Sequence, residues 1–156
     1  MPAIYITTII NAPVERCFDL ARSIDLHSFS MAHTGEKAIA GKTSGLINKG
    51  ETVTWRATHF GIAQTLTSLI TEVEYPVLFE DRMVKGAFKG FYHKHYFEQR
   101  GDQTVMKDEF VFESPLGIIG KFFNALVLTK YMERFLIKRN AILKHVAESD
   151  EWKKYI

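Results

Sequence analysis

Residues 88–112 read FKGFYHKHYFEQRGDQTVMKDEFVF, and this stretch decides the fold of the chain. Two runs that are rich in aromatic and β-branched residues flank Gly101 and Asp102, a dipeptide typical of two-residue hairpin turns. With this dipeptide as the turn, residues at equal distances from it face each other across the two strands. The stretch therefore predicts an antiparallel hairpin in which His95 lies opposite Asp108 and His93 lies opposite Phe110.

One face of the predicted hairpin has the composition of a protein interior. Because successive side chains of a strand point to opposite faces, the residues of this face recur at every second position. In opposed pairs they are Phe91 with Phe112, His93 with Phe110, His95 with Asp108, and Phe97 with Met106. Polar groups among so many apolar side chains must be hydrogen-bonded. A pair formed by His95 and Asp108 meets that requirement.

The strand that follows Pro76 is expected to extend this interior. Its alternation sets Phe79, Asp81 and Met83 on one side, and the turn at Pro76 brings Asp81 opposite Ile70. An inward Asp81 would join the polar groups of the hairpin. The sequence thus predicts a polar cluster that several strands build together.

An earlier strand contributes a further inward face. Val53, Trp55, Ala57 and His59 alternate with residues that are more polar on average. This alternation favours an interior position for the face that holds Trp55. We expect Trp55 and His59 to reach the same interior as the hairpin.

The flanking segments complete the predicted architecture. Residues 3–10 have strand composition, and helical spacing indicates two short helices, one after Pro13 and one that starts at Ser23. Glycine and proline positions divide residues 36–112 into six strands. An antiparallel meander is the simplest topology for six consecutive strands.

The last part of the chain changes to a helical period. Apolar residues recur with a period of 3.6 from Ile119 and predict one long amphipathic helix that ends near Glu148. Its expected polar face holds Lys121, Lys130, Glu133, Arg134, Lys138, Arg139 and Lys144. The whole pattern predicts an α+β fold, in which a curved antiparallel sheet of about seven strands closes over this helix and encloses a pocket.

The composition limits the possible functions. At 156 residues the chain suits a single domain spanning 1–156. Its 20 Lys and Arg against 18 Asp and Glu are scattered and give a net charge of only +2, so no electrostatic footprint for nucleic acid is present. The 12 Phe, 6 Tyr and 2 Trp are many for this length and suit a large interior lined by aromatic rings.

No targeting or membrane segment can be recognised in the sequence. The first residues lack a charged region followed by an apolar one, so the expected location is cytoplasmic. The most apolar stretch, 116–128, is interrupted by Lys121 and Asn124 and is shorter than the roughly 20 residues that span a bilayer. Membrane insertion is therefore not expected.

The residue pattern gives little support to metal binding or nucleophilic catalysis. Two histidines at i and i+2 of a strand, His93 and His95, can both bind zinc, with Asp108 as a third ligand. Glu98 points to the opposite face and no fourth ligand is evident, so no metal is expected. Cys17, the single cysteine, lies on an apolar helix stripe and is expected in the core. Phosphate-binding glycine motifs are absent too, and no cofactor is expected.

The order of elements resembles that of the START/SRPBCC superfamily, the helix-grip fold of ligand carriers and polyketide cyclases. The matching segments are 4–10 with Ala12, Pro13 and Phe18, then 53–57, 86–89, 93–98, Asp108, 114–117, and Arg139 with Asn140. The chain looks like the small bacterial, cyclase/dehydratase-like branch of that superfamily. Because one fold hosts several activities, the resemblance implies the fold and leaves the function open.

The leading hypothesis is a protein that binds a hydrophobic or amphipathic small molecule, such as a lipid, a polyketide or a quinone, between the sheet and the last helix. Apolar pockets with a few convergent polar groups are the usual pattern of such sites. The predicted ligand-binding residues are Trp55, His59, Phe79, Asp81, Met83, Phe91, His93, His95, Asp108, Phe110, Phe122, Phe123 and Leu126.

Two alternatives remain open on the sequence. One is a cyclase or dehydratase in which His95, oriented by Asp108, is the general base. The other is a non-catalytic protein-interaction module whose partner the sequence does not identify. Both alternatives are compatible with the same fold.

Overall fold

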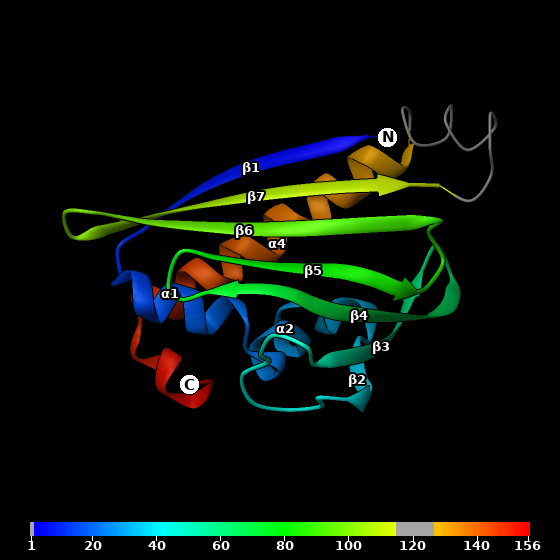
Figure 1. The fold of residues 1–156 in the computed structure, drawn as a ribbon, viewed down its shortest axis with the longest axis horizontal. Coiled ribbons are helices and arrows are strands. Elements are labelled where there is room, and N and C mark those ends of the chain that lie inside the picture. The colour runs from blue at the N-terminus through cyan, green and yellow to red at the C-terminus, as the bar shows by residue number, and fades with distance from the viewer. Residues whose placement is uncertain (1, 115–126) are drawn as a thin grey trace.

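The computed structural model describes residues 2–114 and 127–156, and its elements are shown in Figure 1. The strands are β1 Ala3–Ile10, β2 Lys37–Gly41, β3 Thr52–His59, β4 Ile62–Glu74, β5 Leu78–Lys85, β6 Gly90–Arg100 and β7 Gln103–Glu113. The helices are α1 Val14–Ala21, α2 Ile24–Ser30 and α4 Thr129–Glu148, with short 3-10 turns η1 Ala32–Thr34 and η3 Asp150–Lys154.

The seven strands form one antiparallel sheet in the order β1-β7-β6-β5-β4-β3-β2. Strands β2 to β7 therefore form a meander, and its last strand, β7, also pairs with the first strand of the chain, β1. Helix α4 crosses one face of this sheet, behind β6 and β7 in Figure 1, and packs against β1, α1 and α2. This architecture confirms the predicted α+β fold with two short helices and one long C-terminal helix. None of the described helices is long and apolar enough to cross a membrane.

The hairpin of β6 and β7 has the register that its turn predicts. His95 pairs with Asp108, His93 with Phe110, and Arg100 with Gln103. Gly101, the first turn residue, has a φ of 59°, which glycine adopts without steric cost. A positive φ at this position is the requirement of a type II′ hairpin turn, so the local sequence sets the register of the whole hairpin.

Irregular pairing bends the sheet toward α4. The register shifts between Thr67 and Ser68 and between Ile70 and Glu72 on β4, and again at the edge strand β2. Such bulges bend a strand and increase its twist. Because the sheet curves, its inner face and α4 do not meet everywhere, and space remains between them.

Apolar side chains fill the rest of the interior. Phe18 of α1 has 0% exposure and makes edge contacts with Phe79 and Phe97, at ring-centroid distances of 5.4 and 5.2 Å. Cys17 belongs to the same cluster, and burial raises the pKa of its thiol to about 11. The thiolate needed for nucleophilic chemistry is therefore not available there near neutral pH.

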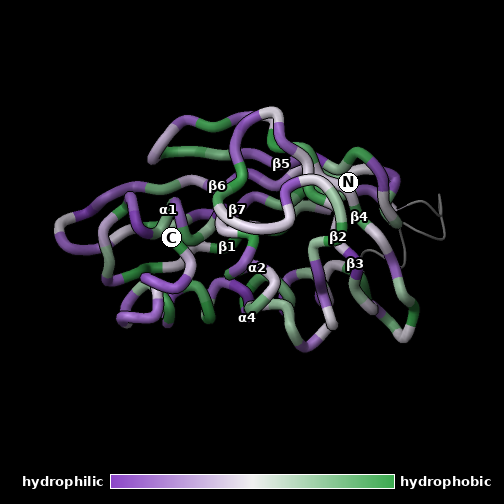
Figure 2. Tube along the Cα trace, turned by 90° about the horizontal axis from the view of Figure 1, so that it is seen from below, coloured by the Kyte–Doolittle hydropathy of each residue, from purple (hydrophilic) through white to green (hydrophobic). Residues whose placement is uncertain are grey.

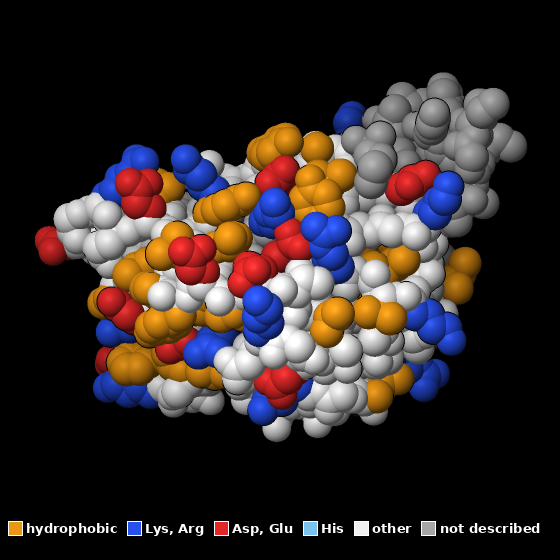
Figure 3. Space-filling view, in the orientation of Figure 1, with side chains coloured by type: hydrophobic (Ala, Val, Ile, Leu, Met, Phe, Trp, Pro, Cys, Tyr) orange, Lys and Arg blue, Asp and Glu red, His pale blue; other side chains and the backbone are white. Residues whose placement is uncertain are grey.

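The two faces of the sheet differ in character. Hydrophobic and hydrophilic residues alternate along the strands, as Figure 2 shows. On the outer face, acidic and basic side chains lie side by side, as Figure 3 shows. Glu80, for example, contacts both Arg82 and Lys94. The outer face is thus a solvated mixed-charge surface, and the inner face supplies the candidate site.

Candidate functional site

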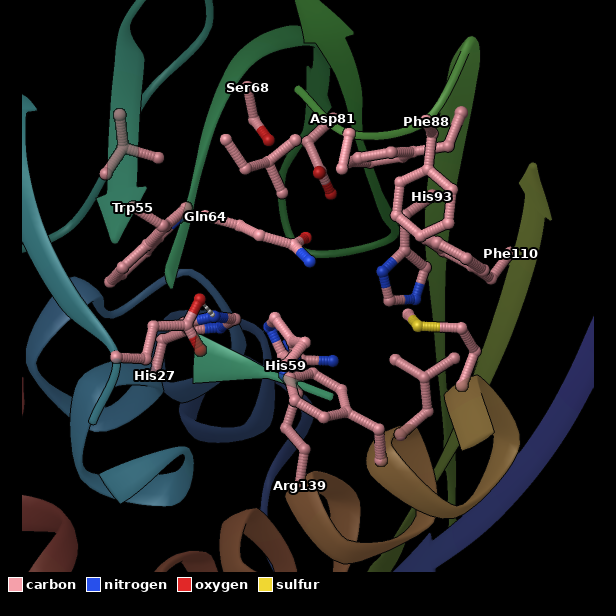
Figure 4. A pocket seen from close by; sticks show the side chains of 18 of the residues that line it. His27, Trp55, His59, Gln64, Ser68, Asp81, Phe88, His93, Phe110 and Arg139 are labelled. Carbon is pink, nitrogen blue, oxygen red and sulfur yellow. Dashed lines mark hydrogen bonds and ion pairs between the residues drawn. The ribbon is translucent and has the colours of Figure 1, made fainter. Parts of the chain in front are cut away.

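A cavity of about 500 Å³ lies between the inner face of the sheet and α4 (Figure 4). Its walls are mainly apolar and aromatic, with contributions from β3 to β7, α2 and α4. Of the residues predicted from the sequence, the cavity wall includes Trp55, His59, Phe79, Asp81, Phe91, His93, His95 and Phe110. The volume lies within the usual range for small-molecule sites, roughly 300–1,000 Å³.

The remaining predicted residues lie elsewhere. Asp108 is 2% exposed and sits behind the histidines, outside the cavity wall. Met83 lies beside Gly86 and is also outside the wall, although it shares the register of Asp81 on β5. Phe122, Phe123 and Leu126 fall outside the described residues.

Asp108 organises a polar cluster at one end of the cavity. One oxygen, Oδ1, lies 2.9 Å from Nε2 of His93 and 2.9 Å from Nδ1 of His95. The other oxygen, Oδ2, accepts a hydrogen bond of 2.6 Å from Nδ2 of Asn140, on α4. The carboxylate therefore ties the sheet to the helix and holds two imidazole rings.

The predicted pair of His95 and Asp108 is in contact, but His93 shares the same carboxylate oxygen. The two residues are opposed as expected, but the hydrogen bond with suitable direction is donated by His93. Nδ1 of His95 is as close to the carboxylate but does not point along a hydrogen bond, and it has no other partner among the described residues. The two rings lie on the same face with centroids 3.8 Å apart, so they compete for one oxygen.

Asp81 approaches the same cluster from β5. Its Oδ1 lies 3.4 Å from Nε2 of His95. Asp81 pairs with His93 across the two strands, and the His95 ring stacks on Phe79 at a centroid distance of 4.1 Å. Phe79 and His93 thus enclose the His95 ring from both sides, and its two nitrogens face two different carboxylates.

Arg139 is a residue that the sequence pattern assigns wrongly. Its place on α4 suggested the solvent-facing side, but it is 5% exposed and lines the cavity. Its Nη2 donates to the carbonyl oxygen of Ala21, and its Nη1 lies 3.8 Å from Oδ1 of Asp108. Nη1 donates no hydrogen bond to any of the described residues. A charged side chain can replace an apolar one on the inner stripe when a buried carboxylate faces it.

Burial and mutual contacts set the charges of the cluster. Desolvation lowers the pKa of His93 to about 4, and the neighbouring His95 acts in the same direction. Burial would raise the pKa of Asp108, but its contacts with His93 and His95 hold that pKa well below the ordinary value. Burial would also raise the pKa of Asp81, but its contact with His95 acts in the opposite direction, and the pKa of Asp81 is lowered. Near neutral pH the cluster holds two carboxylates beside a neutral His93.

A second group of polar side chains lies along the opposite wall. His27 contacts Glu36 at 3.3 Å and packs on the ring of Trp55, with a centroid distance of 4.3 Å. Nδ1 of His59 lies 2.6 Å from the hydroxyl of Tyr131, and burial lowers the pKa of His59. Figure 4 shows His27, Trp55 and His59 on the side of the cavity away from His93.

The cavity wall also includes Gln64 and Phe135, and several of its residues give no usable signal in the sequence. His27 and Glu36 belong to short segments without a clear period, and Gln64 lies in a strand whose pairing is irregular further along. Tyr131 and Phe135 do show a signal, because they are spaced four apart on the apolar stripe of α4. That stripe alone cannot distinguish a packed core from a cavity wall.

Comparison with known proteins identifies the fold. No family model matches the sequence, and a search of the curated proteins found no match either. Among solved structures, a protein from Thermus thermophilus superposes with a TM-score of 0.72 at 15% identity, covering 94% of this chain and 99% of that one. The ginseng major latex-like protein 151 from Panax ginseng gives a TM-score of 0.71 at 15% identity, over 95% and 98% of the two chains.

A START superfamily protein from Mycobacterium smegmatis is also similar, with a TM-score of 0.70 at 12% identity over 94% of this chain and 97% of that one. At such identities the likeness concerns the fold. The chain therefore has the helix-grip fold of the START/SRPBCC superfamily, as the order of its elements suggested.

Proposed function

We propose that this helix-grip chain binds a hydrophobic or amphipathic small molecule, such as a lipid, a polyketide or a quinone, in the cavity between its sheet and α4. The observation that carries the proposal is the cavity of about 500 Å³, whose mainly apolar wall ends at a buried polar cluster. Burying apolar ligand surface against such a wall stabilises the complex by roughly 25 cal/mol per Å² before the entropic costs of association.

Two charged side chains of the wall indicate where the polar groups of the ligand would bind. Nη1 of Arg139 and Oε2 of Glu36 are buried without a hydrogen-bond partner among the described residues, and both residues line the cavity. A ligand with an acceptor toward Arg139 and a donor toward Glu36 would match the charges of these two side chains. We therefore favour an amphipathic ligand over a pure hydrocarbon.

The two tryptophans provide a direct test of this proposal. Trp55 lines the cavity, whereas Trp152 packs against the guanidinium group of Arg16 at 4.3 Å and is not part of the cavity wall. A dibrominated stearic acid quenches indole emission at near contact. In Trp152→Phe, whose emission comes from Trp55, we expect saturable quenching of most of the signal. In Trp55→Phe, whose emission comes from Trp152, we expect little quenching.

Equal quenching of the two variants, with both folded by circular dichroism, would show that the probe binds outside the cavity. Native mass spectrometry of the purified chain supplies a second measurement that does not depend on the choice of probe. A co-purified amphiphile supports the proposal and identifies the ligand. A chain without any such ligand that also fails to show saturable quenching would contradict it.

The enzymatic alternative has less support in this geometry. Both nitrogens of His95 face carboxylates, so the ring has no free base directed at a substrate. His93 has a pKa of about 4 through burial, which makes it a weak base near pH 7. Neither the protein-interaction alternative nor the cytoplasmic location rests on a feature of this site, and both stay predictions.

A further inference from the structure

We propose that Asp81, His93 and His95 hold a divalent transition-metal ion, such as Zn²⁺, at the polar end of the cavity. The inference goes beyond ligand carriage and does not depend on it, because metal binding can be measured without any organic ligand. It also departs from the sequence, which suggested Asp108 as the third ligand and no bound metal.

The three side chains have the spacing of a metal site. They project from the inner face of the adjacent strands β5 and β6, where Asp81 and His93 are directly opposed. One ligand atom from each lies within 4.8 Å of the others. In a tetrahedral site with bonds of about 2.1 Å, two ligand atoms are roughly 3.4 Å apart. Nε2 of His95 and Oδ1 of Asp81 are separated by 3.4 Å.

Asp108 has the position of an orienting partner and not that of a ligand. Metal-bound histidines commonly donate their second N–H to a carboxylate, which sets the tautomer and aims the other nitrogen at the ion. Oδ1 of Asp108 lies 2.9 Å from a nitrogen of each imidazole, and its Oδ2 is occupied by Asn140. Nδ1 of His93 and Nε2 of His95 are then left with lone pairs for a cation.

The two carboxylates that contact His95 give an independent reason for a cation. A neutral imidazole has one N–H, yet the ring meets Asp108 at Nδ1 and Asp81 at Nε2. With the proton at Nδ1, the lone pair of Nε2 faces the oxygen of Asp81 at 3.4 Å, and with the proton at Nε2, the lone pair of Nδ1 faces the oxygen of Asp108 at 2.9 Å, so each tautomer leaves one repulsive contact. A metal ion bound by Nε2 and Asp81 removes this conflict. The alternative is an imidazolium that bridges two carboxylates, and the experiment below distinguishes the two.

The charges that face the site also favour a cation. Asp81 and Asp108 each contribute a negative charge, and Arg139, whose Nη1 lies 3.8 Å from Asp108, contributes a positive one. With neutral imidazoles the cluster has a net charge of −1. A divalent ion would change this to +1. Asp81 is the ligand nearest to solvent, with 19% of its side chain exposed, and the open position would face the cavity.

The test is a titration of the full chain with Co²⁺ after treatment with a chelator. We expect one equivalent to give the visible d–d absorption of a low-coordinate nitrogen–oxygen site, and one equivalent of Zn²⁺ to abolish it. Asp81→Asn and His95→Gln should each weaken Co²⁺ binding by at least about 100-fold, since each removes a direct ligand. The matched control is His145→Gln, which removes an exposed histidine and should bind as the wild type does.

Circular dichroism of each variant establishes that it is folded, and Asp81→Asn keeps the test valid if His95→Gln does not fold. The proposal is overturned if Asp81→Asn binds Co²⁺ as tightly as the wild type, or if His145→Gln abolishes the absorption. It is also overturned if the wild type gives no saturable absorption, and ¹⁵N NMR would then be expected to show His95 protonated on both nitrogens. That last result would establish the bridging imidazolium.

Discussion

Replacement of Asp108 by leucine is expected to lower the free energy of unfolding by about 3–5 kcal/mol, the cost of breaking a buried charged network from one side. His93 would lose its acceptor, and Asn140 would lose the oxygen to which Nδ2 donates at 2.6 Å. Arg139 would keep a buried charge without a facing carboxylate. Urea unfolding followed by circular dichroism measures the change.

The isosteric replacement Asp108→Asn should cost much less, on the order of 1 kcal/mol. Its carbonyl oxygen can still accept from His93. Its amide can donate to Asn140 once that side chain turns over, because Oδ1 of Asn140 has no partner among the described residues. Equal losses of stability for the leucine and asparagine variants would contradict this account of the cluster.

These two variants of Asp108 also distinguish a structural role of this residue from a functional one. If Asp108 orients histidines that hold a metal ion, Asp108→Asn should keep its fold but bind Co²⁺ about 10- to 100-fold more weakly, as is usual when an orienting carboxylate is neutralised. If Asp108 is purely structural, the folded asparagine variant should bind Co²⁺ and the brominated fatty acid as the wild type does.

The stability of the metal-free protein is expected to fall by roughly 3 kcal/mol as the pH is lowered from about 6.5 to about 4. In the unfolded chain His93 takes up a proton near its ordinary pKa of 6.5, whereas in the fold burial lowers its pKa to about 4. The unfolded state therefore binds more protons between these values, and acid favours unfolding. Below about pH 4 this contribution no longer changes.

Other groups that face His93 extend the effect to lower pH. The pKa values of Asp81 and Asp108 are lowered in the fold, so the stability that these carboxylates contribute is lost only as they become protonated at still lower pH. We expect a decline that starts near pH 6.5 and continues below pH 4.

Urea unfolding at a series of pH values, in the presence of a chelator, measures the slope. His93→Gln keeps a donor for Asp108 without a titrating group and should lose most of the decline between pH 6.5 and 4. His145→Gln, at a histidine with 75% side-chain exposure, should retain it. A His93→Gln variant with the slope of the wild type would mean that another group causes the acid sensitivity.

Local chemistry determined the hairpin and, through it, most of the fold. A two-residue turn at Gly101 and Asp102 leaves one register for β6 and β7, and every opposed pair follows from counting outward. Asp81 lies opposite Ile70 as predicted, but there the pairing depends on a register shift between Ile70 and Glu72 and not on regular counting from the turn. Alternation then settles which face is apolar, so the sequence alone places His93, His95 and Asp81 on the inner face.

Tertiary structure decided which atoms meet on that face. The sharing of Asp108 between two rings depends on ring orientation and on Asn140, which arrives from α4, 32 residues further along the chain. Arg139 faces inward because a buried carboxylate lies opposite it, a fact about β7 that the helix pattern does not contain. Met83 lies outside the cavity wall although it is in register with Asp81, so alternation along β5 does not by itself identify the residues of the wall.

The cavity itself is also a tertiary property. A stripe of aromatic residues on α4 has the same period whether it packs against the sheet or stands away from it. The distance between the two depends on the curvature that the β-bulges impose and on side chains such as Glu36 and His27, which converge from short segments. The period of a sequence pattern predicts the direction in which each side chain points. A binding site also depends on the distance between that side chain and the residues that it faces, which the period does not contain.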